Sequence, residues 1–180
     1  GDYDHQYSYH ITTEDGDNDA INATAPNLPD WLTFSEAAAD VSTFAGATSG
    51  YADGTGVNAK FASLAGMVLD AAGNMFVADQ SNHRIRKITP AGVVSTFAGS
   101  TYGYIDGIGT DTKFYNPNSI AIDAEDNIYV YDVNNYKIRK ITPAGVVSTL
   151  AGSKAGYEDG TGANAKFGLV MGLTTDMEGN

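Results

Sequence analysis

Cysteine is absent from the 180-residue chain, so the protein has neither disulfide bonds nor thiolate metal ligands. Basic residues are few: 10 Lys and Arg stand against 22 Asp and Glu, which gives a formal net charge of −12. A surface this acidic repels phosphate backbones and anionic lipid headgroups. The composition therefore argues against nucleic acid as a partner and favours cations or partners with basic groups.

Long hydrophobic runs are also lacking, since no stretch approaches the roughly 18 apolar residues that a membrane-spanning helix needs. The amino-terminal sequence GDYDHQYSYH has neither the basic region nor the apolar core of a secretion signal. We therefore expect no membrane insertion. Glycine and tyrosine are abundant, at 21 and 11 residues, a composition typical of short strands joined by tight turns.

An internal repeat of 53 residues dominates the rest of the chain. The sequence VSTFAG begins at Val41 and again at Val94, VSTLAG begins at Val147, and 94 − 41 = 147 − 94 = 53. Four further sets keep this spacing: Asp53, Asp106 and Asp159; Lys60, Lys113 and Lys166; Phe61, Phe114 and Phe167; Asp70, Asp123 and Asp176. Self-similarity of this length predicts a propeller, a solenoid or an array.

Each period contains four short β-prone runs, which in the first full copy are 67–70, 75–79, 84–89 and 93–97. Turn sequences separate them, and Ala72-Gly73-Asn74 and Glu125-Asp126-Asn127 supply the residues that tolerate positive φ in a hairpin. In RIRKIT, isoleucine does not alternate strictly with basic residues. Ile85 and Ile88 can therefore both face packed layers only if the strand bends or twists between them. We interpret RIRKIT as an outer strand with a basic, solvent-facing side.

Four antiparallel strands followed by a Gly-rich connection form the pattern of a propeller blade, which needs a neighbour on each face. The sequence GMVLDAAGNMFVADQSNHRIRKITPAG, from Gly66, resembles an NHL repeat, with Asn82-His83-Arg84 at the family's characteristic triplet and Asn135-Tyr136-Lys137 in the next copy. The resemblance covers residues 41–180. It implies a β-propeller, commonly six-bladed, used mainly for binding protein, glycan or RNA, with a minority of enzymes.

The predicted fold is therefore all-β, with NHL-type blades in about 2.6 repeats, since 140/53 is about 2.6. Closed propellers usually have 4–8 blades. The predicted divisions are 41–93, 94–146 and a partial repeat at 147–180. Three arrangements remain open: a fragment of a longer protein, which we favour, chains that pool blades, or an open stack. On its own, the chain is expected to be oligomeric or poorly soluble because of exposed faces and edges.

Residues 1–40 do not fit the repeat. They contain YSYHI from Tyr7, the acidic run TEDGDND from Thr13 and LPDWLTF from Leu28. This pattern resembles part of a cadherin-like, dystroglycan-type domain. The resemblance implies a partial immunoglobulin-fold segment, completed elsewhere in a longer chain or by strand addition from a neighbour.

The candidate metal site lies in this first segment. Asp15, Asp17 and Asp19 alternate along a turn, where carboxylates can converge on Ca²⁺. No Glu follows at the EF-hand position, so a solvated acidic turn is the competing interpretation. Asn22-Ala23-Thr24 is an N-glycosylation sequon, usable if the protein is secreted by a competent cell.

The repeated acidic residues have structural and functional interpretations. The Asp-Gly-x-Gly copies at Asp53, Asp106 and Asp159 are expected to be Gly-dependent turns in which Asp accepts N–H bonds, although they could gather oxygens around a metal. Asp79 and Asp132 end a strand; we expect them to fix the next turn, the alternative being carboxylates beside a central channel. The repeated Lys is expected to be paired or to extend along its packed Phe.

No catalytic constellation is recognisable. His5, His10 and His83 share no metal-ligand spacing, and neither a Ser-His-Asp order nor a nucleophile elbow occurs. The leading hypothesis is a non-enzymatic extracellular or cell-surface protein for adhesion or for matrix or filament scaffolding. Its partners would be protein or glycan ligands, further copies of itself or the rest of a longer chain. The alternatives are a propeller-borne lyase or hydrolase for carbohydrate or peptide, with catalytic residues outside this sequence, and a soluble ligand-binding propeller.

Overall fold

The computed structural model describes residues 42–176, which belong to one compact unit. The immunoglobulin-like segment predicted for residues 1–40 lies outside the described residues. No α-helix occurs in residues 42–176, and no helix there could cross a bilayer.

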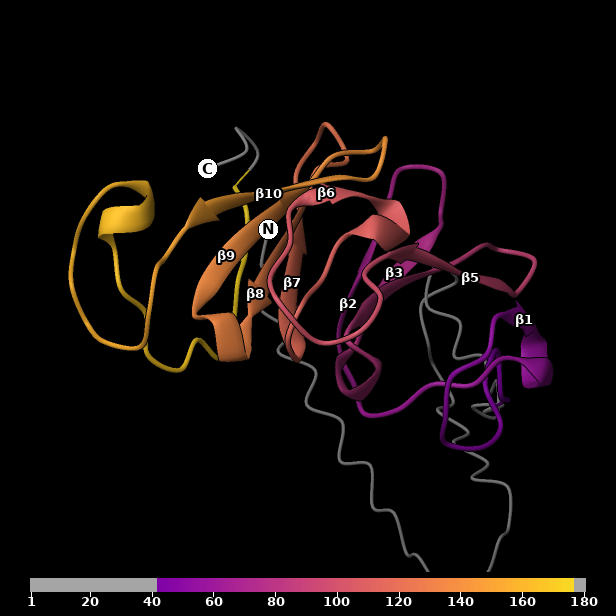
Figure 1. Cartoon of the computed structure of the whole chain (residues 1–180). Coiled ribbons are helices and arrows are strands. Elements are labelled where there is room, and N and C mark those ends of the chain that lie inside the picture. Colours follow the sequence, from indigo (N-terminus) through magenta and orange to yellow (C-terminus); the bar gives the residue numbers. More distant parts are fainter. Residues whose placement is uncertain (1–41, 177–180) are drawn as a thin grey trace, which may run out of the picture. The chain divides into compact units, whose positions relative to one another are not determined.

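Two five-stranded antiparallel sheets form this unit (Figure 1). In spatial order, the first contains β1 (Gly54–Thr55), β5 (Val93–Ala98), β4 (Arg84–Ile88), β3 (Met75–Asp79) and β2 (Leu64–Leu69). The second repeats this order with β6 (Gly107–Ile108), β10 (Val146–Ala151), β9 (Lys137–Ile141), β8 (Ile128–Asp132) and β7 (Pro117–Ile122). Short 3₁₀ turns follow β1, β3, β6, β8 and β10 along the chain: η1 (Gly56–Asn58), η2 (Gln80–Asn82), η3 (Gly109–Asp111), η4 (Val133–Asn135) and η5 (Gly162–Asn164).

The four predicted strands are confirmed, with small differences at their ends, and so are the turns between the first two of each sheet. Each of the two predicted turn triplets contains one residue with positive φ: Gly73 at +78° and Asp126 at +61°. In both turns an aspartate closes the loop: the Asp70 and Asp123 carboxylates accept hydrogen bonds from the backbone N–H groups of Asn74 and Asn127. The two-residue strands β1 and β6 were not predicted.

The prediction that RIRKIT is an outer, solvent-facing strand is wrong. β4 is the central strand of its sheet, because β5 and β1 lie beyond it. Ile85 packs between the two sheets, whereas Ile88 packs in a second apolar cluster with Ala59, Val77 and Val94. Both faces of the strand are thus covered, so no bend is needed to bury the two isoleucines. Arg86 is 0% exposed on the same face as Ile88.

The two sheets pack through one shared apolar core. Phe76 and Ile85 of the first sheet join Phe114, Ile120 and Val130 of the second in this core. The contacts between the two sheets are concentrated at strands β2 and β7. A Cβ on Gly66 would lie 2.7 Å from Ile120 Cγ2 and 2.9 Å from the Asn118 carbonyl, so only glycine fits there. The same core explains why apolar positions recur at a spacing of 53 residues.

The end of the described part of the third copy also packs against the second sheet. Leu173 N–H donates to Ser119 Oγ at 2.8 Å, and the Thr175 hydroxyl donates to the Ile122 carbonyl at 2.5 Å. These residues lie beside β7, and in the third copy they occupy the repeat positions of β2 and β7. The segment of the third copy that corresponds to β2 and β7 is therefore packed on the second sheet.

Candidate functional site

A buried arginine occupies the centre of each sheet. Arg86 Nη1 donates to Asp79 Oδ2 at 2.7 Å, and its Nη2 donates to Asp53 Oδ1 at 2.6 Å. The Arg86 and Asp79 side chains are both 0% exposed, whereas that of Asp53 is 46% exposed. One guanidinium therefore joins a strand-end carboxylate to the loop before β1, with a planar fork of donors that lysine lacks.

Backbone carbonyls and aromatic rings complete the arginine site. Arg86 also donates to the carbonyls of Lys60 at 3.1 Å and Ala52 at 2.8 Å. Its guanidinium lies 5.0 Å from the Tyr51 ring centroid and 5.1 Å from that of Phe61. Only Nε lacks a hydrogen-bond partner. We call this set of two carboxylates, two carbonyls and two rings the arginine cradle.

The second copy repeats the cradle almost atom for atom. Arg139 donates to Asp132 at 2.8 Å, to Asp106 at 2.5 Å and to the carbonyls of Lys113 and Ile105 at 3.1 and 3.0 Å. Burial raises the pKa of Asp132, against the opposing effects of hydrogen bonds from Asn135 and Tyr115 N–H and of the charge and hydrogen bond of Arg139. In both copies the two carboxylates accept hydrogen bonds from the buried arginine, so these residues stabilise the sheet.

The asparagine three residues after the strand-end aspartate links the cradle to the turn after β3. Asn82 Nδ2 donates to the Asp79 carboxylate and to the Gly50 carbonyl, at 2.9 and 2.8 Å. Asn135 makes the equivalent bonds to Asp132 and Gly103. The expected turn-fixing role of Asp79 and Asp132 is thus confirmed, although each also neutralises a buried arginine.

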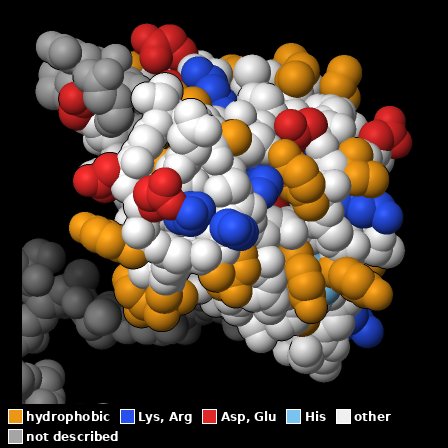
Figure 2. Space-filling model, turned by 60° about the vertical axis from the view of Figure 1, so that its left-hand side comes forward, with side chains coloured by type: hydrophobic (Ala, Val, Ile, Leu, Met, Phe, Trp, Pro, Cys, Tyr) orange, Lys and Arg blue, Asp and Glu red, His pale blue; other side chains and the backbone are white. Residues whose placement is uncertain are grey.

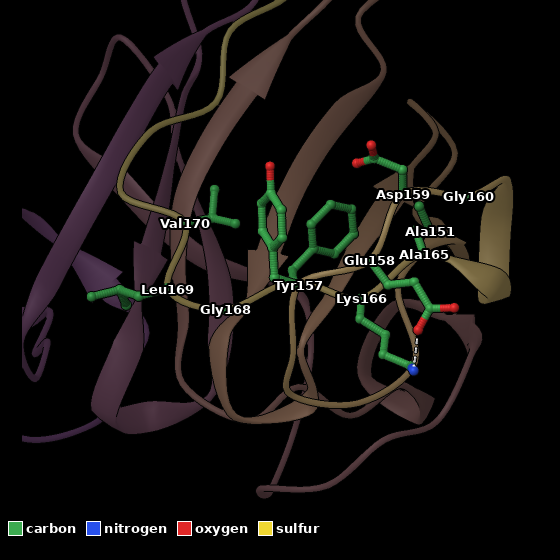
Figure 3. Close-up of a pocket in the computed structure, with 11 residues that line it drawn as sticks. Ala151, Tyr157, Glu158, Asp159, Gly160, Ala165, Lys166, Gly168, Leu169 and Val170 are labelled. Atoms are coloured by element: carbon green, nitrogen blue, oxygen red, sulfur yellow. Dashed lines mark hydrogen bonds and ion pairs between the residues drawn. The ribbon is translucent and has the colours of Figure 1, made fainter.

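The described part of the third copy contains the loop residues of a cradle. Its loop bears Tyr157, Asp159 and Phe167 at the positions of Tyr51, Asp53 and Phe61, around an open pocket of about 340 Å³ (Figure 3). Figure 3 shows Tyr157 and Asp159 pointing to one side of the loop, while Glu158 and Lys166 form an ion pair on the other. Tyr157 is 94% exposed, against 48% for Tyr51.

An aromatic cluster lies between the two sheets at the end of β3. The ring centroid of His83 is 5.9 Å from that of Tyr102 and 5.7 Å from that of Tyr115, and the two tyrosine rings are 5.5 Å apart. Tyr102 is 65% exposed and Tyr115 is 38% exposed. Tyr136, Ala155 and Gly168 occupy the equivalent positions of the next copy, so the cluster is not part of the repeated scaffold.

His83 is held as a neutral hydrogen-bond donor. The backbone N–H of Asn116 donates to its Nδ1 at 3.2 Å, so the ring proton is on Nε2. Burial lowers the pKa of His83, and the positive charge of Arg84 lowers it further, against a smaller opposing effect of Asp79. The cluster thus offers two aromatic faces, two phenol groups and one imidazole N–H.

The residues predicted for calcium binding and glycosylation are Asp15, Asp17, Asp19 and Asn22, and they lie outside the described residues. Within residues 42–176, no group of three or more His, Asp or Glu is placed to hold a metal ion. The expectation of a packed Phe and a paired Lys is met only in part: Phe114 is fully buried and Lys166 is paired with Glu158, whereas Phe61 and Phe167 are partly buried and Lys60 and Lys113 form no ion pair with a described residue.

No protein-family model matches the chain, and no curated protein matches it. Solved structures do. A protein of unknown function from Bacteroides thetaiotaomicron is 31% identical with a TM-score of 0.58, and the alignment covers 62% of this chain and 30% of that one. An auxiliary nutrient binding protein from Bacteroides ovatus is 25% identical with a TM-score of 0.54, over 62% and 32% of the two chains.

A second auxiliary nutrient binding protein, from Bacteroides thetaiotaomicron, is 22% identical with a TM-score of 0.56, over 62% of this chain and 32% of that one. This chain therefore spans about a third of the length of the proteins it resembles. The likeness supports an all-β, propeller-like fold. The cadherin-like segment has no support from these comparisons.

Proposed function

We propose that this chain is part of a non-enzymatic binding protein whose ligand contacts the aromatic cluster of His83, Tyr102 and Tyr115. The observation that carries this proposal is the contrast between repeated and unrepeated residues. The arginine cradles and turn aspartates recur and hold the sheets together. The aromatic cluster occurs at one junction and is exposed, as recognition requires.

A glycan is the ligand class that suits this cluster. The apolar C–H face of a sugar ring packs on exposed aromatic faces, and its hydroxyls can bond to the phenol groups and to His83 Nε2–H. A similar solved structure, 25% identical, is that of an auxiliary nutrient binding protein, which is compatible with a binding role. Figure 2 shows one face of the molecule, where hydrophobic side chains project in separate groups between charged ones.

Titration calorimetry against a panel of neutral oligosaccharides tests the proposal. We expect saturable binding that falls at least tenfold in Tyr102→Ala. Tyr157→Ala serves as the matched control, because Tyr157 is exposed but lies in another copy. Equal binding by wild type and Tyr102→Ala would refute the assignment, and turnover of a saccharide would favour the enzyme alternative.

The wider role that we propose is adhesion or scaffolding outside the cell. The absence of cysteine and the acidic surface are compatible with it, and the repeated sheets provide a rigid support for a recognition surface. Locating the native protein by surface labelling of intact cells tests this role. Labelling only after cell lysis would contradict it.

Calcium binding by Asp15, Asp17 and Asp19 is a separate proposal, supported by their alternation in sequence. Calorimetric titration with Ca²⁺ after chelation should give heat that is lost in the Asp15→Ala, Asp17→Ala double variant. No heat with the wild-type chain would contradict it.

A further inference from the structure

Tyr102 and Tyr115 are two surface tyrosines whose rings are in contact. Their ring centroids lie 5.5 Å apart, the angle between the ring planes is 43°, and the two residues are 65% and 38% exposed. Among the tyrosines of residues 42–176, no other two rings are in contact. The two rings are therefore near enough to react with one another and remain open to a reagent in solution.

The repeated backbone holds this pair together. Gly103 N–H donates to the Phe114 carbonyl at 3.0 Å, so the residues flanking this bond, Tyr102 and Tyr115, lie side by side. The first and third copies make the same glycine-to-phenylalanine bond, at 2.9 and 3.2 Å. At the two tyrosine positions they have Ser49 with Ala62 and Ala155 with Gly168. Every copy thus brings two residues together here, and both are tyrosine in the second copy alone.

The hydroxyl groups of the pair make no hydrogen bond to a described residue. Elsewhere in the described part of the chain, the phenol oxygen bonds to a protein group in Tyr51, Tyr104, Tyr129 and Tyr131. The neighbouring His83 is not a base for the pair, because its Nδ1 accepts the Asn116 N–H and its Nε2 carries the ring proton. A proton that leaves either phenol therefore passes to solvent.

Two phenols in contact can be joined by oxidation, a chemistry that needs no cysteine. One-electron oxidation removes an electron and the hydroxyl proton from each phenol and leaves a phenoxyl radical with spin density on its ortho carbons. The two radicals join through a new carbon–carbon bond, and the two ortho hydrogens move to the phenol oxygens. Hydrogen peroxide takes up the two electrons and two protons and becomes two molecules of water. The chain lacks cysteine, so a link of this kind would be independent of disulfide chemistry.

We propose that Tyr102 and Tyr115 are an intramolecular dityrosine site, which a haem peroxidase with hydrogen peroxide couples in the folded chain. The angle of 43° between the ring planes suits a biaryl bond, whose rings are twisted rather than stacked. The bond ties the loop before β6 to the segment before β7, across 115 − 102 = 13 residues. The second copy thereby gains a covalent link at the surface of the junction between the sheets.

Treatment of the complete 180-residue chain with a haem peroxidase and hydrogen peroxide, at low protein concentration, tests the proposal. We expect dityrosine fluorescence in a product that migrates as a monomer and whose mass is lower by two hydrogen atoms. After trypsin digestion, mass spectrometry should find residues 88–113, which contain Tyr102, linked to residues 114–137, which contain Tyr115. The linked chain should unfold at a higher urea concentration, because the link restricts the unfolded chain.

Two variants make the result specific. Tyr102→Phe keeps the ring but cannot form the phenoxyl radical, so the fluorescence of the monomer and the linked fragments should be lost. Tyr104→Phe changes a tyrosine of the same loop that is 47% exposed, and it should keep both. No link in the wild-type chain, links only between chains, or a monomer link that survives in Tyr102→Phe would overturn the proposal.

The fragments also distinguish the competing ring. A link from residues 61–84, which contain His83, would show that the imidazole reacts and would overturn the assignment to Tyr115. No glycan is added in this experiment, so its outcome does not depend on whether the aromatic cluster binds one.

Discussion

Arg86 and Asp79 form an ion pair of 2.7 Å in which neither side chain is exposed. Both are on adjacent strands of the first sheet, β4 and β3, and Asp79 also accepts hydrogen bonds from Asn82 Nδ2 and Ala62 N–H. A buried carboxylate with this many donors is fully satisfied only while the arginine remains.

Replacing the arginine should therefore strongly destabilise the protein. Arg86→Met leaves the Asp79 charge buried without its partner, and we expect the free energy of unfolding to fall by about 3–5 kcal/mol. Lys87→Met, which changes a partly exposed residue of the same strand, should cost under about 1 kcal/mol. Urea denaturation followed by circular dichroism measures both, and similar losses for the two variants would contradict the prediction.

Gly66→Ala should weaken the packing between the two sheets. The added methyl group would meet Ile120 Cγ2 at 2.7 Å and backbone atoms within about 3 Å, so we expect a loss of about 1–3 kcal/mol. Gly172 is the same repeat position two copies later and has open space around it. Gly172→Ala is thus the matched control and should unfold at the wild-type urea concentration.

The ionisation of His83 should be visible in both spectra and stability. Burial lowers the pKa of His83, so NMR titration should place it below the ordinary value of about 6.5. Between the folded and unfolded pKa values the unfolded chain binds more protons, so the free energy of unfolding rises as pH rises through this window. His83→Asn should flatten that rise. A midpoint above 6.5 would contradict the assigned bond from Asn116.

The turn aspartates should contribute to acid sensitivity. Burial opposes ionisation of Asp123, but hydrogen bonds from Asn127, Tyr129 and Glu125 N–H outweigh it and lower the pKa. A lowered folded-state pKa gives stability that is present above about pH 3.9 and is lost as pH falls through the folded pKa. Asp123→Asn should reduce the loss of stability measured by urea denaturation between pH 5 and pH 2. An unchanged loss of stability between pH 5 and pH 2 would show that the hydrogen bonds do not favour the charged carboxylate.

Local patterns predicted much of the fold. Short apolar runs indicated the four strands of each sheet, and Gly73 and Asp126 marked turns by their tolerance of positive φ. The fifth strand could not be predicted in this way, because Gly54 and Thr55 form a strand through pairing with Val93 and Val94, which lie far along the chain.

The cradle and the aromatic cluster required the three-dimensional structure. RIRKIT resembles a solvent-facing strand because basic residues are usually exposed, and only the sheet order shows that Arg86 is central. A signal was present, since Arg86 and Arg139 recur at the spacing of Asp53 and Asp106. His83, Tyr102 and Tyr115 come from separate loops, and no sequence period connects them.

The pairing of β1 with β5 has a consequence for the order of folding. Gly54 pairs with Val94, and 94 − 54 = 40 residues separate them, while Arg86 binds Asp53 across 33 residues. During synthesis the loop before β1 emerges first. Its contacts with Arg86 and β5 can form only after those residues have been synthesised. Each sheet is therefore completed late, through long-range contacts that slow folding, and the arginine holds the loop before β1 to the rest of the sheet.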